Sequence, residues 1–283
     1  MANQSHIHDC PLEVLAAARN HAHKAAQLLT KAARANLEAA PDDSHSNLSW
    51  QASRGAFMSQ PLAGDNGEVR VGLTIADLTL LVTGAGGAET SLDLGGAADA
   101  DALAWLDAQL AQAGLKPASS VALPYDLPGS VEAIGTYGGD ELGQGLAALV
   151  AWFALAESIF TQFAAANADI EPGPSPVRCW PHHFDIATYV ALESGDFETA
   201  RGVGVGLSPG DATYDQPYFY VNPWPHLDAG DLPDLPPPGY WHTQGFVGAI
   251  ATAKHIFTLA DIEAELPAFV AGAFAISRQK LGA

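Results

Sequence analysis

The sequence predicts an α+β protein in which antiparallel sheet elements are flanked by three substantial helices. Apolar residues recur at helical spacing near the N-terminus, in the middle and near the C-terminus of the chain. Between these helices, short runs alternate apolar with small or polar residues, as strands do, and Gly- and Pro-rich turns separate them. Each half is thus expected to hold a helix, several strands and a helix. Two alternatives stay open, namely two similar halves at 1–140 and 141–283, or one compact domain.

The first half is expected to begin with a long helix. Pro11 suits a first-turn position, and the helix carries an apolar stripe through Ala22, Ala26, Leu29, Ala33 and Leu37 before Pro41 ends it. Strands are predicted at 69–75 and 78–82, where every second residue is apolar, and 89–94 is expected to be a further strand after the turn at 84–87. A short helix near 100–113 would then bury Leu103, Leu106 and Leu110.

The second half is built around the clearest helix of the chain. Its apolar residues follow one another every three or four positions, at Leu142, Leu146, Leu149, Phe153, Ala156, Phe160 and Phe163. The Pro-rich stretch 171–176 ends this helix, and strands are predicted at 177–191, 202–207, 218–221 and 241–246. A last helix is expected from Thr258, where Thr258 and Asp261 form a capping-box-like signal, to about Lys280.

Composition excludes several classes of function. The 283 residues carry a formal net charge of −20, which argues against nucleic acid and anionic membranes as partners because both need a basic face. Two cysteines cannot build a disulfide framework. The longest apolar run, 145–156, is shorter than the roughly 20 residues of a membrane span, and the first residues do not resemble a signal peptide. We therefore expect an acidic, soluble, cytoplasmic protein.

Several short motifs follow one another in a particular order along the chain. They are Ser53-Arg54-Gly55, Ile75-Ala76-Asp77, Ser175-Pro176-Val177 with Trp180, Phe184, Asp185 and Ala187, and Tyr218-Phe219-Tyr220 with Pro223 and Pro225. Their order resembles that of the uncharacterised bacterial family DUF5996. The chain departs from the family pattern at His182-His183, where small residues are expected. The resemblance covers the chain to about residue 230. It implies a shared fold and supplies no activity, cofactor or catalytic residue.

The segment 178–185, Arg-Cys-Trp-Pro-His-His-Phe-Asp, is the richest in chemistry-bearing side chains. On a strand, His183 and Asp185 would share one face about 6.5–7 Å apart, close enough for both to reach one cation. Imidazole plus carboxylate suits Zn²⁺, or Fe and Mn with more oxygen ligands. The candidate metal or acid–base residues are accordingly His183, Asp185 and His242, with His182 and His226 as second choices.

A structural role for these histidines is the leading alternative. Histidines beside Trp and Pro often bond to backbone carbonyls in a packed core, and a metal-free site could instead use a histidine as acid or base. Asp211 could add a carboxylate to the site, although an Asx turn is the favoured interpretation. The cofactor is therefore left open, with a divalent metal such as Zn as the candidate.

The run Gly202–Gly206, which alternates Gly and Val, could suggest a phosphate-binding loop. Such loops precede a helix N-terminus, whereas here Pro209-Gly210 follows and no helical pattern comes after. Alternation of Val and Gly instead fits a strand with one bare face, which a neighbouring backbone or a ligand could approach closely.

Aromatic residues concentrate in the same region as the histidines. Residues 180–246 hold half of the chain's Phe, Trp and Tyr residues. On a strand, Tyr218 and Tyr220 would project together while Phe219 enters the other layer. Candidate pocket residues for a flat or apolar ligand are Trp180, Tyr218, Tyr220, Trp224 and Trp241.

Three classes of function follow from these patterns. The working hypothesis is a small-molecule enzyme with a metal or histidine site around residues 180–185. The alternatives are a non-catalytic binding module with an aromatic pocket, and a structural or oligomer-forming protein. The sequence leaves the substrate, the reaction and the oligomeric state open.

Overall fold

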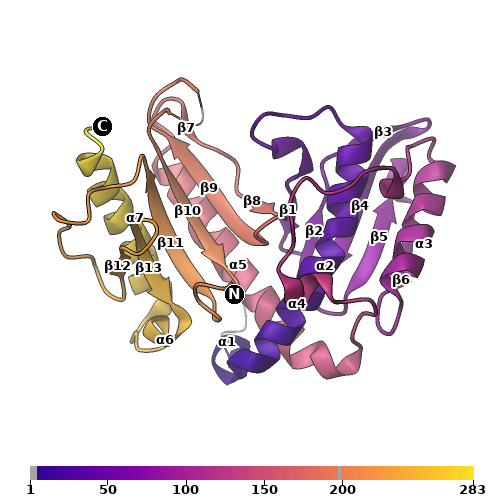
Figure 1. Ribbon diagram of the computed structural model, residues 1–283, viewed down its shortest axis with the longest axis horizontal. Helices are drawn as coiled ribbons and strands as arrows, with labels where there is room; N and C mark the ends of the chain where they lie inside the picture. Colours follow the sequence, from indigo (N-terminus) through magenta and orange to yellow (C-terminus); the bar gives the residue numbers. More distant parts are fainter. Residues whose placement is uncertain (1–4, 197–198) are drawn as a thin grey trace. The chain divides into compact units, whose positions relative to one another are not determined.

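The computed structural model describes residues 5–196 and 199–283 and divides into two compact units. The first unit comprises Met1–Ala154 and Arg178–Phe184, and the second comprises Leu155–Val177 and Asp185–Ala283. Each unit holds an antiparallel sheet with helices (Figure 1), which confirms the predicted α+β class. The segment 178–184, which the sequence analysis placed in the second half, belongs to the first unit.

The strands of the first unit form an antiparallel sheet in the order β1-β2-β4-β5-β6, with β3 paired to β4. Its strands are β1 Ser49–Gln51, β2 Ala56–Met58, β3 Leu62–Gly64, β4 Gly67–Thr74, β5 Thr79–Thr83 and β6 Glu89–Asp93. The later strand β8 Arg178–Trp180 also belongs to this unit, where the backbones of Cys179 and Leu48 exchange hydrogen bonds of 2.8 and 2.9 Å.

The helices of the first unit cover this sheet. They are α1 Ser5–Asp9, α2 Leu12–Asn36, α3 Asp99–Gln112, α4 Gly129–Glu132 and the first half of α5 Gly143–Ala166, with short 3₁₀ turns at Ser44–Ser46, Ala85–Gly87, Ala118–Ser120 and Asp140–Leu142. Four rings pack edge to face or tilted in its core, with centroids 4.9–5.9 Å apart: Trp50, Phe57, Phe153 and Phe184. The predicted helices at 11–41, 100–113 and 142–163 thus exist with slightly different ends.

The second unit holds a sheet in the order β12-β13-β11-β10-β9-β7, antiparallel throughout. Its strands are β7 Gly173–Pro174, β9 Asp185–Ala191, β10 Gly202–Ser208, β11 Tyr218–Trp224, β12 Tyr240–His242 and β13 Gly248–Thr252. Its helices are the second half of α5, α6 Ala253–Ile256 and α7 Ile262–Lys280.

One face of this second sheet is apolar and packed against helices. Val203, Val205 and Leu207 of β10 are fully buried on that face. Phe219 of β11 packs on Phe160 of α5, with ring centroids 5.5 Å apart, and α7 contacts β10 and β11. Alternation along each strand sends the intervening side chains to the opposite face, which is where the site described below lies.

Two expectations about local structure are wrong. The predicted strand 177–191 is two strands, β8 and β9, separated by a turn at 181–184. The last helix begins at Ile262 rather than Thr258, because Asp261 is its N-cap. The Asp261 carboxylate accepts from the amide of Ala264, and Glu265 reaches back to the amide of Asp261. The capping box is therefore real but lies three residues later than predicted.

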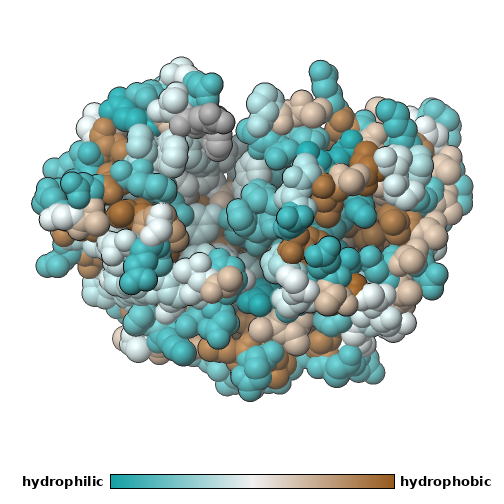
Figure 2. Space-filling view, in the orientation of Figure 1, coloured by the Kyte–Doolittle hydropathy of each residue, from teal (hydrophilic) through white to brown (hydrophobic). Residues whose placement is uncertain are grey.

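Helix α5 also bears on the question of membranes. By length and composition alone, Asp140–Ala166 is the one helix among the described residues that could cross a membrane, and 56% of its most apolar window is buried inside the structure. A core helix of a soluble protein passes the same test. Hydrophilic side chains cover much of the visible surface of each unit (Figure 2). The cytoplasmic location and the exclusion of membrane partners stay predictions.

Candidate functional site

The residues nominated from the sequence fall into two groups. Trp180, His182 and His183 lie in the first unit. The second unit holds Asp185, Tyr218, Tyr220, Trp224, His226, Trp241 and His242. Within residues 5–196 and 199–283, no three His, Cys, Asp or Glu side chains are arranged so that they could hold a metal ion. The metal site and the Zn cofactor therefore stay predictions.

The first group forms a turn, which we call the histidine turn, at residues 181–184. The amides of His183 and Phe184 both donate to the carbonyl of Trp180, over 3.1 and 2.7 Å. Phe184 has a φ of 59°, a left-handed conformation that ends strand pairing. Residues 181–184 therefore do not alternate as a strand does. The prediction that His183 and Asp185 share one strand face is wrong.

Side chains of helix α2 hold this turn in place. His23 Nε2 and Gln27 Nε2 each lie 2.9 Å from the carbonyl oxygen of Pro181. Tyr125 in turn donates to Gln27 Oε1 over 2.8 Å. The ring of His23 stacks on Phe184, with centroids 5.1 Å apart and planes 5° apart. His23 is thus a packed structural histidine, the role that the sequence analysis had favoured for its neighbours.

Burial keeps two of these histidines neutral. It lowers the pKa of His23 to about 4. It also lowers the pKa of His182 to about 4, with the adjacent His183 adding to the effect. The rings of His182 and His183 lie against each other, with centroids 4.2 Å apart. Pro181 and Phe184 are buried, His182 is half-buried and His183 is exposed, so the turn is a hydrogen-bonded element at the edge of the first unit's core.

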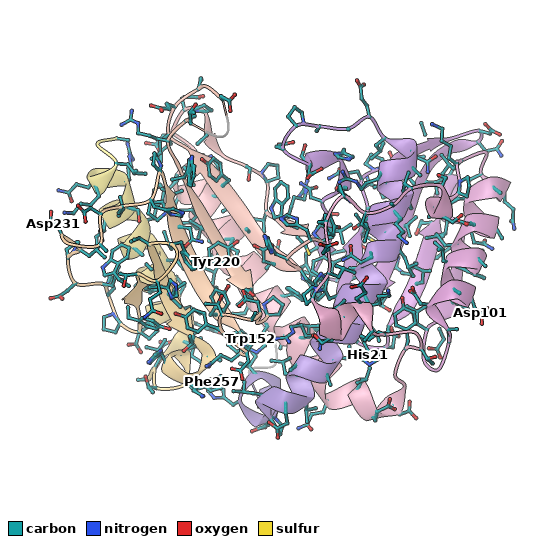
Figure 3. The ribbon with its side chains drawn as sticks, in the orientation of Figure 1. His21, Asp101, Trp152, Tyr220, Asp231 and Phe257 are labelled. Atoms are coloured by element: carbon teal, nitrogen blue, oxygen red, sulfur yellow. The ribbon has the colours of Figure 1, made fainter. Side chains whose placement is uncertain are left out.

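Most of the second group lies on the face of the second unit's sheet that is opposite the helices, which we call the tyrosine face. Its residues, from the five neighbouring strands β9, β10, β11, β13 and β12, are Asp185, Tyr189, Gly202, Gly204, Gly206, Ser208, Tyr218, Tyr220, Asn222, Trp224, Gly248 and His242. The glycines of β10 provide its floor. This confirms the prediction of a strand with one bare face, and Figure 3 shows Tyr220 among the side chains on these strands.

Two tyrosines cross the glycine strand from opposite sides. A Cβ atom at Gly206 would lie 2.3 Å from the hydroxyl of Tyr220, and one at Gly202 would lie 2.1 Å from the hydroxyl of Tyr189. Both rings therefore lie directly on glycine backbone. Gly204, between them, has nothing closer than 3.8 Å to the same position. The middle glycine is left as an uncovered floor.

The tyrosine hydroxyls are held by carboxylates. Tyr220 donates to the buried carboxylate of Asp185, and Tyr218 donates to Asp211 Oδ2 over 2.6 Å. Burial, reinforced by Asp211, raises the pKa of Tyr218 far above its ordinary value. Asp211 Oδ1 also accepts from the amide of Thr213 at 2.7 Å, which confirms the predicted Asx turn.

His242 completes the polar border of this face. Its Nδ1 lies 2.8 Å from the Tyr214 hydroxyl, and its Nε2 lies 2.6 Å from the carbonyl oxygen of Gln244. The carbonyl can only accept, so Nε2 carries the proton and Nδ1 accepts from Tyr214 in the neutral ring. The ring also stacks on Phe246, with centroids 4.3 Å apart. Both ring nitrogens are thus already engaged.

A cavity of about 570 Å³ opens above the uncovered glycine, and we call it the glycine hollow. It is lined by residues of β9, β10, β11 and the loop that follows, namely Tyr189, Gly204, Tyr220, Asn222, Pro223, Trp224 and His226. Among the residues that the structure describes, Trp224 is the one large hydrophobic side chain that is exposed, at 38%. His226 meets it edge to face at 5.1 Å. The size is typical of small-ligand pockets.

Comparisons with protein-family models, curated proteins and solved structures find no match to this chain. The resemblance to DUF5996 therefore stays a prediction. The function is therefore inferred from the geometry of the glycine hollow.

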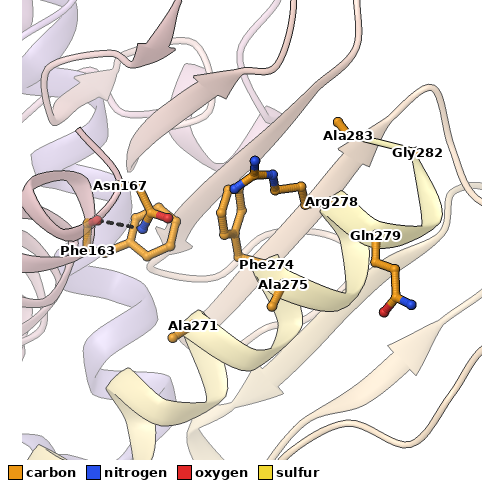
Figure 4. A pocket seen from close by; sticks show the side chains of 9 residues that line it. All are labelled: Phe163, Asn167, Ala271, Phe274, Ala275, Arg278, Gln279, Gly282 and Ala283. Atoms are coloured by element: carbon orange, nitrogen blue, oxygen red, sulfur yellow. Dashed lines mark hydrogen bonds between the residues drawn. The ribbon is translucent and has the colours of Figure 1, made fainter. Parts of the chain in front are cut away.

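A second hollow of about 460 Å³ lies beside helix α7 (Figure 4). Its lining is Phe163, Asn167, Ala271, Phe274, Ala275, Arg278, Gln279, Gly282 and Ala283. The Asn167 amide is already bonded to the carbonyl of Phe163 over 2.8 Å, and Phe163 packs edge to face on Phe274. Of the polar side chains of this hollow, Asn167 is thus engaged and Arg278 and Gln279 are exposed, so variants at this hollow are suitable controls.

Sequence reasoning identified part of the glycine hollow and missed the rest. Tyr220, Trp224 and His226 were nominated and do line it, whereas Tyr189 and Asn222 were not nominated. Trp241 lies in register with Ala249, on the opposite face, and donates to the carbonyl of Pro233 over 2.7 Å. The Gly-Val-Gly-Val-Gly run was the signal that could have located Tyr189 and Asn222, since they are the cross-strand neighbours of Gly204.

Proposed function

We propose that this chain is a binding module that holds a small molecule with a flat ring in the glycine hollow. The observation that carries the proposal is the bare floor at Gly204 between Tyr189 and Tyr220, with the exposed Trp224 beside it. Aromatic side chains around a glycine floor let a planar ligand approach the backbone and stack on rings.

The arrangement of polar groups favours binding over metal chemistry. The Asp185 carboxylate lies behind Tyr220 and accepts its hydroxyl, and both nitrogens of His242 are engaged. Trp224 places an exposed indole at the rim of the hollow, where a flat ring can stack on it. The aromatic pocket foreseen as the alternative to an enzyme is therefore the function that this geometry supports best.

The proposal is tested by filling the hollow from its floor. Gly204→Leu places a side chain in the cavity without backbone strain, because a Cβ at Gly204 meets only ordinary contacts. Ala275→Leu adds a similar volume in the second hollow and is the matched control. Saturation-transfer NMR with indene, indole and benzimidazole should show a ring bound to the parent and to Ala275→Leu, and at least tenfold weaker binding to Gly204→Leu.

Either of two results would overturn the proposal. One is that none of the three rings binds the parent protein. The other is that a folded Gly204→Leu variant, judged by an unchanged circular dichroism spectrum, binds them as well as the parent does.

A further inference from the structure

We propose that the ligand of the glycine hollow is an uncharged flat heteroaromatic ring whose edge carries a hydrogen-bond donor and an acceptor, and that Asn222 recognises this edge. The inference rests on the proposed function and names the chemical class that the pocket selects. A purine-like or benzimidazole-like ring has these properties.

The carboxamide of Asn222 stands between two positions that lack side chains. On β11 it is in register with Gly204 of β10, and its side chain lies against Gly248 of β13. A Cβ at Gly248 would lie 2.1 Å from Asn222 Oδ1, so the amide oxygen rests directly on that glycine. Larger residues at either glycine would occupy the place of the amide or the floor of the hollow.

The amide oxygen of Asn222 has no partner within the described part of the chain. Oδ1 is buried and accepts no hydrogen bond there. Native proteins seldom leave a buried polar atom unsatisfied, so an atom of this kind beside a cavity is a place where a ligand can supply the missing hydrogen bond. The terminal torsion of asparagine is broad, so the carboxamide can turn either its donor or its acceptor toward the hollow. A ligand edge with both groups satisfies either orientation.

The walls of the hollow set the shape of the ligand. Tyr189 and Tyr220 cover the glycines that lie two residues on either side of Gly204, which places them about 6.5–7 Å along the strand from it. A planar ring seated on Gly204 meets these two rings at their edges, and edge-to-face contact is one of the arrangements that aromatic pairs prefer. A bulky saturated group gains no such contact. The exposed indole of Trp224 provides a further stacking surface.

Charge disfavours ionic ligands. Among the described residues that line the hollow, none is Asp, Glu, Lys or Arg, so an ionic ligand would lose its hydration and meet at most the imidazole of His226 in return. The net charge of −20 repels anions in addition. An uncharged heteroaromatic ring avoids both costs while bonding to Asn222.

A series of bicyclic rings with one shape and graded polarity tests the inference. Indene has no ring nitrogen, indole has a donor, and benzimidazole and purine have a donor and an acceptor. At pH 8, where benzimidazole is neutral, titrations should show that the parent binds benzimidazole about five- to tenfold more tightly than indene. Asn222→Leu should bring this ratio to about one while keeping indene binding.

Two further variants serve as controls for this test. Asn222→Ala only removes atoms, and it should abolish the preference even if the leucine variant folds poorly. Gln279→Leu removes a carboxamide at the second hollow and should leave the ratio as in the parent. Equal binding of indene and benzimidazole to the parent, or an unchanged ratio in folded Asn222 variants, would overturn this inference alone. Failure of every ring to bind the parent would overturn the proposed function with it.

Discussion

The histidine turn and the tyrosine face hold their polar side chains in opposite ways. In the turn, His23 and Gln27 converge on one carbonyl, and Phe184 closes the space around them. On the tyrosine face, the rings of Tyr189 and Tyr220 lie over glycines and leave a cavity of about 570 Å³ between them.

This difference shows that a side chain's suitability for binding a ligand depends less on its residue type than on whether its donors and acceptors already have partners. Histidines are common ligands, yet His23 already bonds to the backbone carbonyl of Pro181. The His182 ring packs on the His183 ring, and burial keeps it neutral. On the tyrosine face, Asn222 has a buried amide oxygen that accepts no hydrogen bond from the described residues. An asparagine in the sequence does not by itself indicate a binding site. Four changes would break or sharpen this contrast.

The largest effect is expected from Phe184→Ala. Phe184 is 1% exposed and contacts the rings of Phe57 and Phe153, so its truncation should lower the free energy of unfolding by about 3–5 kcal/mol. Trp224→Ala, on the exposed rim of the tyrosine face, should cost less than about 1 kcal/mol. Urea denaturation of both variants measures the difference. Similar costs would mean that the rim is as tightly packed as the turn.

The next effect is the acid sensitivity that His23 confers. The folded-state pKa of about 4 lies below the roughly 6.5 of an unfolded histidine, so the stabilisation is complete above pH 6.5 and is lost as pH falls toward 4. The loss amounts to about 3 kcal/mol once the pH is below 4. His23→Gln should be less stable than the parent at pH 8 and should lose less stability on acidification. Parallel denaturation curves from pH 8 to pH 4 would contradict this account of the turn.

A matched pair of glycine substitutions should separate the covered and uncovered parts of the floor. Gly206→Ala displaces the Tyr220 ring from the Asp185 carboxylate and should cost about 1–3 kcal/mol. Gly204→Ala meets only ordinary contacts and should be neutral or stabilising by up to about 1 kcal/mol, because it restricts the unfolded chain. Thermal unfolding of the two variants decides the point. Equal destabilisation would show that Gly204 is covered as well.

Local patterns were enough to predict much of this fold. Helix α5 and strand β10 each display their periodicity along one continuous segment, so the core stripe and the bare glycine face could be inferred directly. Strand β13 was missed because all five of its residues are buried, which removes the alternation that marks a half-exposed strand. The sequence thus predicts an element well when its residue types recur with a regular period along one segment, as Val and Gly do in β10.

The histidine turn and Asn222 could not be predicted, since both depend on distant partners. The carbonyl of Pro181 is held by His23, 158 residues earlier, and no sequence pattern near Pro181 indicates that contact. Asn222 matters because it lies opposite Gly204 on β10 and its side chain lies against Gly248 on β13. Such registers are set by the whole sheet rather than by any short segment.

The smallest of the four effects concerns the decrease in the free energy of unfolding at alkaline pH. Burial and Asp211 raise the pKa of Tyr218 in the folded state above the value of about 10 in the unfolded chain. The hydroxyl therefore contributes stability that is fully present below pH 10 and declines as the pH rises further. Tyr218→Phe should remove up to one proton from this dependence, a slope change of at most about 1.4 kcal/mol per pH unit. Denaturant titrations of parent and variant between pH 8 and 11 measure it, and identical slopes would show that the Tyr218–Asp211 bond does not anchor the tyrosine face.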